Sequence, residues 1–221
     1  MGFSLGIVAL YSLFFKLKPS HVRYKAVILV LCFHILILFT LSLRRNQMYR
    51  DPSLLWEEVL SLYPDNPRAL NNMGTAYANQ GRGSESAKRA FERAEAADPN
   101  DFMAQYNLGV YYGKNKEYEK AIPYYEKSIE LNPNYISSYN NLGIIFKERG
   151  QLDKAVQLFI HAVQMDPQHI NARYNLADTY LEQRNYDNAL QEFENALKLA
   201  PNAAYIQQIQ SKIEQIKRLS R

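Results

Sequence analysis

Residues 102–135 read FMAQYNLGVYYGKNKEYEKAIPYYEKSIELNPNY, and this stretch decides the fold. Apolar and small side chains recur in each half at three- and four-residue spacing, which is the period of one helix face. The first half carries the small residue Gly109, and the second carries Ala121 followed four residues later by Tyr125. Pro133 then prevents the second half from continuing as a helix. The stretch therefore predicts two antiparallel helices that pack closely against each other.

The same pattern recurs along the chain with a period of 34 or 35 residues. The periodic prolines are Pro64, Pro99, Pro133, Pro167 and Pro201. The small residues of the first helix are Gly74, Gly109, Gly143 and Ala177. The aromatic residues of the second helix are Phe91, Tyr125, Phe159 and Phe193. Since one helix pair leaves an apolar face bare, the copies are expected to stack into a shared core.

These columns resemble the tetratricopeptide repeat family over about residues 67–201. The resemblance divides this region into four repeats, at about residues 67–101, 102–135, 136–169 and 170–203. It implies an all-α fold in which the repeats form a right-handed superhelix, an α-solenoid. It also implies a scaffold for protein–protein interaction whose concave groove, lined by the first helix of each repeat, holds extended peptide segments of a partner.

Both ends of the array carry a partial pattern. Trp56 precedes Pro64 by eight residues, the offset that separates Phe91 from Pro99. Residues 46–66 are therefore expected to be a linker and a half-repeat helix. Residues 204–221 are predicted to form a capping helix, on which the apolar side chains make one stripe: Ile206, Ile209, Ile213, Ile216 and Leu219. A capping helix with a polar outer face keeps such an array soluble.

The first 45 residues are predicted to be a membrane segment. Ala26–Leu43 is a run of 18 residues without a formal charge, and a helix of that length reaches about 27 Å, close to the hydrocarbon thickness of a bilayer. We expect a transmembrane helix at about residues 26–43. Residues 1–15 are also apolar, so a second, shorter span would complete a transmembrane helix hairpin. A start inside an apolar run further suggests that a longer protein has been cut.

The charge of the chain is divided unevenly between its ends. The first 50 residues hold seven Lys and Arg and no acidic residue. That leaves 19 of the 26 basic and all 22 acidic residues for the remainder, a net charge of −3. By the positive-inside rule, four basic residues between the two spans place that loop in the cytoplasm and the repeats on the extracytoplasmic side, luminal or periplasmic. Three basic residues after the second span argue for the opposite orientation: Arg44, Arg45 and Arg50.

The composition argues against catalysis, cofactors and nucleic acids. The chain has one Cys, Cys32, and four scattered His, which excludes a disulfide framework and a Cys-rich zinc site. No Gly-rich phosphate loop, nucleophile elbow or zinc-protease motif occurs. The mildly acidic repeat region lacks the basic face that phosphate neutralisation requires. We therefore expect a protein without catalytic, metal or cofactor residues and without a nucleic-acid partner.

The candidate binding residues lie on the first helix of each repeat. The sixth repeat position is Asn72, Asn107, Asn141 and Asn175. A side-chain amide both donates and accepts hydrogen bonds, so such a column suits the backbone of an extended peptide; alternatively, the Asn side chains stabilise neighbouring turns. The aromatic, amide and basic residues beside this column are Tyr106, Asn140, Tyr174, Arg68, Lys114 and Lys147. The Lys–Asn pair with which some members of the family clamp a C-terminal carboxylate does not occur at the matching positions.

A second resemblance concerns the junction between membrane segment and repeats. It is carried by Arg44-Arg45-Asn46, then Leu54-Leu55-Trp56-Glu57-Glu58-Val59, then Pro64-Asp65-Asn66, then Ala69-Leu70-Asn71-Asn72-Met73-Gly74. This order is similar to the junction in transmembrane-and-tetratricopeptide proteins of the O-mannosyltransferase type. The resemblance implies an alternative to a membrane-anchored scaffold. The chain would be the non-catalytic, substrate-recruiting C-terminal part of a multi-pass membrane glycosyltransferase.

Overall fold

The computed structural model describes residues 21–79, 84–200 and 202–219. All regular structure within these ranges is α-helical, which confirms the all-α prediction. The helices are α2 (His21–Arg50), α3 (Pro52–Leu62), α4 (Pro67–Asn79), α5 (Ser84–Ala97), α6 (Phe102–Lys114), α7 (Tyr118–Leu131), α8 (Ile136–Glu148), α9 (Leu152–Met165), α10 (Ile170–Glu182), α11 (Tyr186–Leu199) and α12 (Ala203–Leu219). The expected first span at residues 1–15 lies outside the described residues.

The chain divides into two compact units between Leu54 and Leu55. The first unit contains α2, which extends beyond the expected span of residues 26–43 at both ends. Its residues after the apolar run, such as Arg44, Arg45 and Gln47, are good helix formers, so helix formation continues into the polar segment. Over Val27–Arg50 this helix is long and apolar enough to cross a membrane, and none of its most apolar window is buried.

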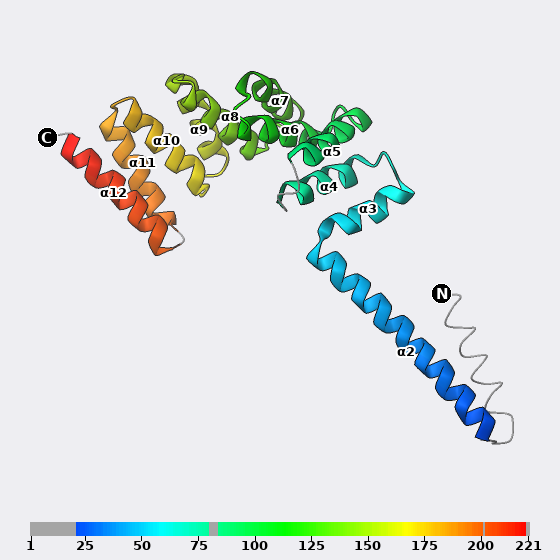
Figure 1. Ribbon diagram of the computed structural model, residues 1–221. Helices are drawn as coiled ribbons and strands as arrows, with labels where there is room; N and C mark the ends of the chain where they lie inside the picture. Colours follow the sequence, from blue (N-terminus) through cyan, green and yellow to red (C-terminus); the bar gives the residue numbers. More distant parts are fainter. Residues whose placement is uncertain (1–20, 80–83, 201, 220–221) are drawn as a thin grey trace. The chain divides into compact units, whose positions relative to one another are not determined.

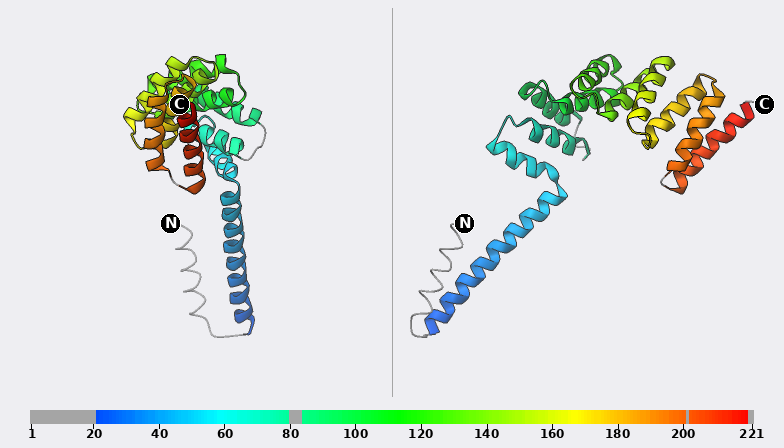
Figure 2. Two further views of the ribbon diagram at one scale, coloured as in Figure 1. Left: turned by 90° about the vertical axis from the view of Figure 1, so that its left-hand side faces the viewer. Right: turned by 180° about the vertical axis from the view of Figure 1, so that it is seen from behind.

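In the second unit the helices pack in sequential pairs along an array (Figures 1 and 2). The closest associations are α4 with α5, α6 with α7, α8 with α9, and α10 with α11, and each pair also packs against the next. The turns within three of the pairs place one residue at positive φ: Lys116, Gly150 and Arg184, at 59°, 72° and 60°. These residues are 34 positions apart, so the same left-handed turn recurs in successive pairs.

Close approach of the paired helices depends on a missing Cβ atom. A Cβ on Gly109 would stand 2.8 Å from Cδ1 of Tyr125, and one on Gly143 would stand 2.7 Å from Cε1 of Phe159. Both distances are shorter than a van der Waals contact, so the aromatic ring occupies the space that a side chain would need. The aromatic rings of the second helices thus pack against the small residues of the first helices.

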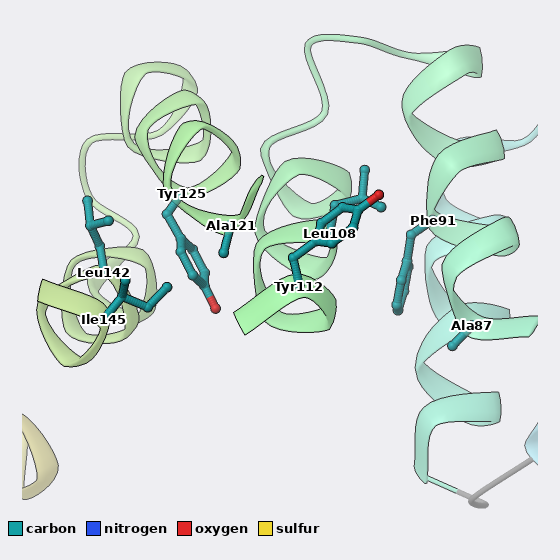
Figure 3. Close-up of a cluster of buried hydrophobic side chains, with 8 residues drawn as sticks. All are labelled: Ala87, Phe91, Leu108, Tyr112, Ala121, Tyr125, Leu142 and Ile145. Atoms are coloured by element: carbon teal, nitrogen blue, oxygen red, sulfur yellow. The ribbon is translucent and has the colours of Figure 1, made fainter. Parts of the chain in front are cut away.

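Stacking of the pairs produces a core that runs from one to the next. Figure 3 shows this core between α5 and α8, where Tyr125 of α7 lies between Ala121 and the two α8 residues Leu142 and Ile145. Toward α5 the same cluster continues through the following buried residues: Leu108, Tyr112, Phe91 and Ala87. Its members come from four helices, so a pair of helices alone would leave much of this apolar surface exposed.

The last helix packs on the array as a further first helix would. Ile209, Ile213 and Ile216 of α12 are buried in a cluster with Phe193 of α11. The expected apolar stripe is shorter at its end, because Leu219 is 52% exposed. Leu219 is also not part of the described cluster that buries the three isoleucines.

Candidate functional site

The predicted asparagine column lies on α4, α6, α8 and α10. All four side chains, Asn72, Asn107, Asn141 and Asn175, are half-buried. The first helices of neighbouring pairs contact one another directly, whereas contacts of that extent are not found between the second helices in the described chain. Because closely spaced helices lie on the shorter arc of a curved stack, the first helices, which carry this column, lie on the inner side of the array.

Hydrogen bonds connect this column from each repeat to the one before it. Nδ2 of Asn107 donates to Oδ1 of Asn71 at 3.3 Å, and Nδ2 of Asn141 donates to the hydroxyl of Tyr106 at 3.3 Å. The corresponding bond in the next repeat runs from Nδ2 of Asn175 to Oδ1 of Asn140 at 2.9 Å. We call this series the amide ladder; it joins positions 35 or 36 residues apart.

The amide ladder uses only part of each side chain. Asn107, Asn141 and Asn175 each donate one side-chain N–H to the preceding repeat. The Oδ1 atoms of Asn107 and Asn175 accept no hydrogen bond from the described residues. Asn72, which has no repeat before it, makes no side-chain hydrogen bond within the described ranges. The column can therefore support the stack and still present carbonyl groups, and at Asn72 a whole amide, to a ligand.

The predicted aromatic residues are largely engaged in packing. The ring of Tyr106 lies 4.9 Å from that of Tyr135 in an edge-to-face arrangement. Burial is the main cause that raises the pKa of Tyr106, and the neighbouring Tyr135 is the second. The ring of Tyr174 packs at 5.4 Å against Phe193, and its hydroxyl accepts a hydrogen bond of 2.9 Å from Gln208 of α12. These two tyrosines therefore join helices of the array to one another.

The predicted basic residues fall into two kinds. Lys147 lies in an ion-pair network that also contains Asp178, Glu182 and Lys212. Its ammonium group pairs with Asp178 and, at 3.1 Å, with Glu182, while Lys212 of α12 pairs with Asp178 at 2.6 Å. Burial by itself lowers the pKa of Lys147, but its two acidic partners outweigh that effect and raise it. The charge of Lys147 is thus neutralised within α8, α10 and α12.

Arg68 and Lys114 differ from Lys147 because neither forms an ion pair within the described residues. Both are exposed, and both line hollows between α4 and α6. One pocket of about 330 Å³ is lined by Arg68, Asn71, Asn72, Thr75, Asp101, Met103 and Asn107. A second, of about 330 Å³ as well, is lined by Thr75, Tyr77, Ala78, Asn79, Ala87, Phe91, Asn107, Val110, Tyr111, Lys114 and Asn115.

The structure thus divides the ten predicted site residues between two places. Arg68, Asn72, Asn107 and Lys114 line the pockets between α4 and α6. The others, Tyr106, Asn140, Asn141, Lys147, Tyr174 and Asn175, take part in contacts between repeats. Thr75, which lines both pockets, is not predicted by the sequence pattern, because a single threonine on a helix carries no recognisable motif.

The described residues contain no group of three or more His, Cys, Asp or Glu side chains placed to hold a metal ion. The polar groups that line the two pockets are amides, hydroxyls, the carboxylate of Asp101 and two unpaired cations, and aromatic and aliphatic side chains lie between them. Such a surface can bind a polypeptide by hydrogen bonds, charge and apolar contact.

Comparison with known proteins agrees with the repeat pattern. Three sequence models described as "Tetratricopeptide repeat" match the chain, one at residues 146–213, one at residues 102–135, and one at residues 55–89 and 124–157. The chain belongs to the tetratricopeptide repeat family. We number the four helix pairs from α4 to α11 as repeats 1 to 4.

The resemblance to proteins of the O-mannosyltransferase type is also supported by a curated relative. The chain is 35% identical over 86 residues to "Protein O-mannosyl-transferase TMTC3" of Homo sapiens. That match covers 38% of this chain and 9% of the human protein, so the chain spans a small part of this relative.

Solved structures of similar fold include the following two. The structure entitled "Crystal structure of YrrB: a TPR protein with an unusual peptide-binding site" has a TM-score of 0.60 and 26% identity, and the match covers 75% of this chain and 84% of that one. "MamA 41-end from Desulfovibrio magneticus RS-1" has a TM-score of 0.61 and 26% identity, covering 70% of this chain and 89% of that one. Both support the assignment of the repeat array as a solenoid.

Proposed function

We propose that this protein is a membrane-anchored scaffold that binds extended peptide segments of a partner protein along the inner side of its repeat array. The proposed organisation is a membrane segment at residues 1–45, a linker and half-repeat at 46–66, four repeats over about 67–201 forming a right-handed superhelix, and a cap at 204–221. The proposed binding residues are the ten predicted from the sequence, with those between α4 and α6 as the centre.

The observation that carries the binding proposal is the free amide of Asn72. It stands in the column that the amide ladder occupies elsewhere, it lines a pocket, and no described side chain uses it. A half-buried amide without a protein partner is available to a peptide backbone, which offers both a donor and an acceptor. The similarity to a fold whose reported structure contains a peptide-binding site agrees with this proposal.

The test uses the full chain in lipid nanodiscs and a displayed library of random peptides. The affinity of each selected peptide is then measured for the variants Asn72→Ala and Asn188→Ala. The second variant is the control, because it removes an exposed asparagine from the second helix of repeat 4. We expect Asn72→Ala to weaken binding and Asn188→Ala to leave it unchanged. Equal binding to both variants, or a library that yields no binder, would contradict the proposal.

Membrane anchoring is proposed from α2, whose apolar side chains are exposed over the length of a bilayer span. In water, such an apolar surface would cause the chains to associate with one another, whereas the hydrocarbon of a bilayer solvates it. We expect the chain to stay with membranes after alkaline carbonate extraction.

Orientation is tested separately. A cysteine placed at the exposed Ser86 is expected to react with a membrane-impermeant maleimide only from the extracytoplasmic side. Release by carbonate would contradict anchoring, and labelling only from the cytoplasm would reverse the orientation.

The second candidate function is the substrate-recruiting part of a membrane glycosyltransferase. It is favoured by the 35% identity to the human O-mannosyl-transferase. The two functions differ in what accompanies the repeats in the cell. An antibody against the repeats would detect a band near 25.7 kDa if this chain is the whole protein, and a much larger band if catalytic membrane helices belong to it.

A further inference from the structure

The two pockets between α4 and α6 adjoin each other, because both are lined by Thr75 and Asn107, and together they make an elongated depression. We call it the α4–α6 trough. One end is at Arg68, near the start of α4, and the other is at Lys114 and Asn79, at the ends of the two helices. From Arg68 to Asn79 a helix rises about 16 Å. An extended peptide of about five residues spans that length.

The two ends of the trough differ in chemistry. At the far end the lining is mainly apolar, with Phe91, Val110 and Tyr111 among its side chains, and its one charged residue is Lys114. At the near end the lining is polar and contains Arg68 and Asp101. The far end is therefore suited to a large apolar side chain that stands beside a negative charge.

Asp101 does not change this charge balance at the far end. Its carboxylate caps α6 by accepting the backbone N–H of Met103 at 2.9 Å, and it accepts Nδ2 of Asn71 at 2.6 Å. Lys114 has no acidic partner in the described chain, in contrast to Lys147, whose acidic partners lie one repeat further on. A ligand carboxylate at Lys114 would thus meet an unpaired ammonium group at the edge of an apolar hollow.

We propose that the α4–α6 trough selects an extended peptide with a large apolar side chain adjacent to a carboxylate. The apolar side chain fills the hollow beside Phe91 and Val110, and the carboxylate pairs with Lys114. Oδ1 of Asn107, which is free within the described residues, accepts a backbone N–H of the peptide. This inference rests on the proposed peptide-binding function and names its ligand chemistry. The carboxylate belongs either to an acidic side chain or to the peptide's C-terminus.

The test measures fluorescence anisotropy of labelled hexapeptides with the full chain in lipid nanodiscs. The first probe carries Phe followed by Glu in a Gly-Ser background with an amidated end. A second replaces Glu by Gln, a third replaces Phe by Ser, and a fourth ends at Phe with a free carboxylate. We expect about tenfold weaker binding after each replacement, as for loss of a charge-assisted hydrogen bond or of a buried aromatic side chain. Comparison of the first and fourth probes identifies the source of the carboxylate.

Two variants assign the effect to the trough. Lys114→Gln is expected to bind the Glu and Gln probes equally. The control Lys198→Gln makes the same change at an exposed lysine of α11 and is expected to keep the preference for the Glu probe. Thr75→Trp fills the trough from an exposed position and is expected to abolish binding with the helical content unchanged. Equal binding of the Glu and Gln probes to the unmodified chain would overturn the inference. If these probes fail while library peptides bind in a manner dependent on Asn72, the proposed function stands and this ligand chemistry is wrong.

Discussion

Nδ2 of Asn175 in α10 donates a 2.9 Å hydrogen bond to Oδ1 of Asn140 in α8. The two residues stand 35 positions apart, and the bond repeats the link that Asn107 makes to Asn71. The asparagine column of the inner side thus has a structural role in three repeats, and the same residue type at Asn72 remains available for a ligand.

The first prediction separates these two roles. Asn175→Ala leaves Oδ1 of Asn140 without its donor, so we expect a loss of about 1 kcal/mol in the free energy of unfolding. Asn72→Ala breaks no hydrogen bond of the described chain and is expected to leave stability unchanged while it weakens peptide binding. Urea unfolding of the full chain in mild detergent, followed by circular dichroism, measures both. A free energy of unfolding of Asn175→Ala equal to that of the unmodified chain would show that the amide ladder does not stabilise the stack.

The second prediction concerns the approach of α6 and α7. Gly109→Ala places a methyl group within 2.8 Å of the buried Tyr125 ring, and we expect a net loss of about 1–2 kcal/mol from overpacking. Gly113→Ala in the same helix is the control, because its methyl group would meet Oη of Tyr125 at 3.6 Å, an ordinary contact. That variant is expected to gain up to about 1 kcal/mol from helix propensity. A gain in stability for both variants would show that the tyrosine ring moves aside.

The third prediction uses the left-handed turns between paired helices. Gly150 and Arg184 hold equivalent positions with φ of 72° and 60°. Since this conformation costs a residue with a Cβ atom about 1–2 kcal/mol, Arg184→Gly is expected to raise the melting temperature and Gly150→Ala to lower it. No atom lies within 4 Å of a Cβ at Gly150, so backbone strain alone accounts for the expected loss. Unchanged melting temperatures would indicate that the turns relax.

The fourth prediction concerns acid. Burial by itself raises the pKa of Asp178, but Lys147 and Lys212 outweigh it and hold the pKa below its ordinary value. The contribution of Asp178 is therefore fully present above the unfolded-state pKa of about 3.9 and is lost as the pH falls through the lower folded-state pKa. We expect Asp178→Asn to be less stable than the unmodified chain at neutral pH, with the difference shrinking in acid.

Denaturant unfolding of both proteins from about pH 7 down to about pH 2.5 gives that difference directly. The raised pKa of Lys147 acts at the other end of the scale, because its contribution is present below about pH 10.4 and is lost as the pH rises through the folded-state value. A difference that stays constant into acid would mean that Asp178 stabilises the fold by packing and not by its charge.

Much of the fold follows from residues that act locally or in a period. Gly109, Tyr125 and their equivalents recur at fixed spacing because each helix pair meets the same packing problem, so the columns predict the pairing. The placement of Asn72 and Asn107 in the groove rests on the family resemblance and stays a prediction. The ion-pair network around Lys147 could not be predicted, since Asp178 and Lys212 lie 31 and 65 positions after Lys147 and no periodic rule joins three singular residues.

The sequence by itself determined the helical class and the repeat period, because one-dimensional periodicity specifies which face of a helix is apolar. Only the tertiary structure decided which polar side chains remain free. That depends on distances between helices one repeat apart, such as the bond from Asn107 to Asn71 and the pairing of Lys147 with Asp178. A hydrogen bond or ion pair forms only where two groups meet within about 3 Å, and folding alone sets that distance.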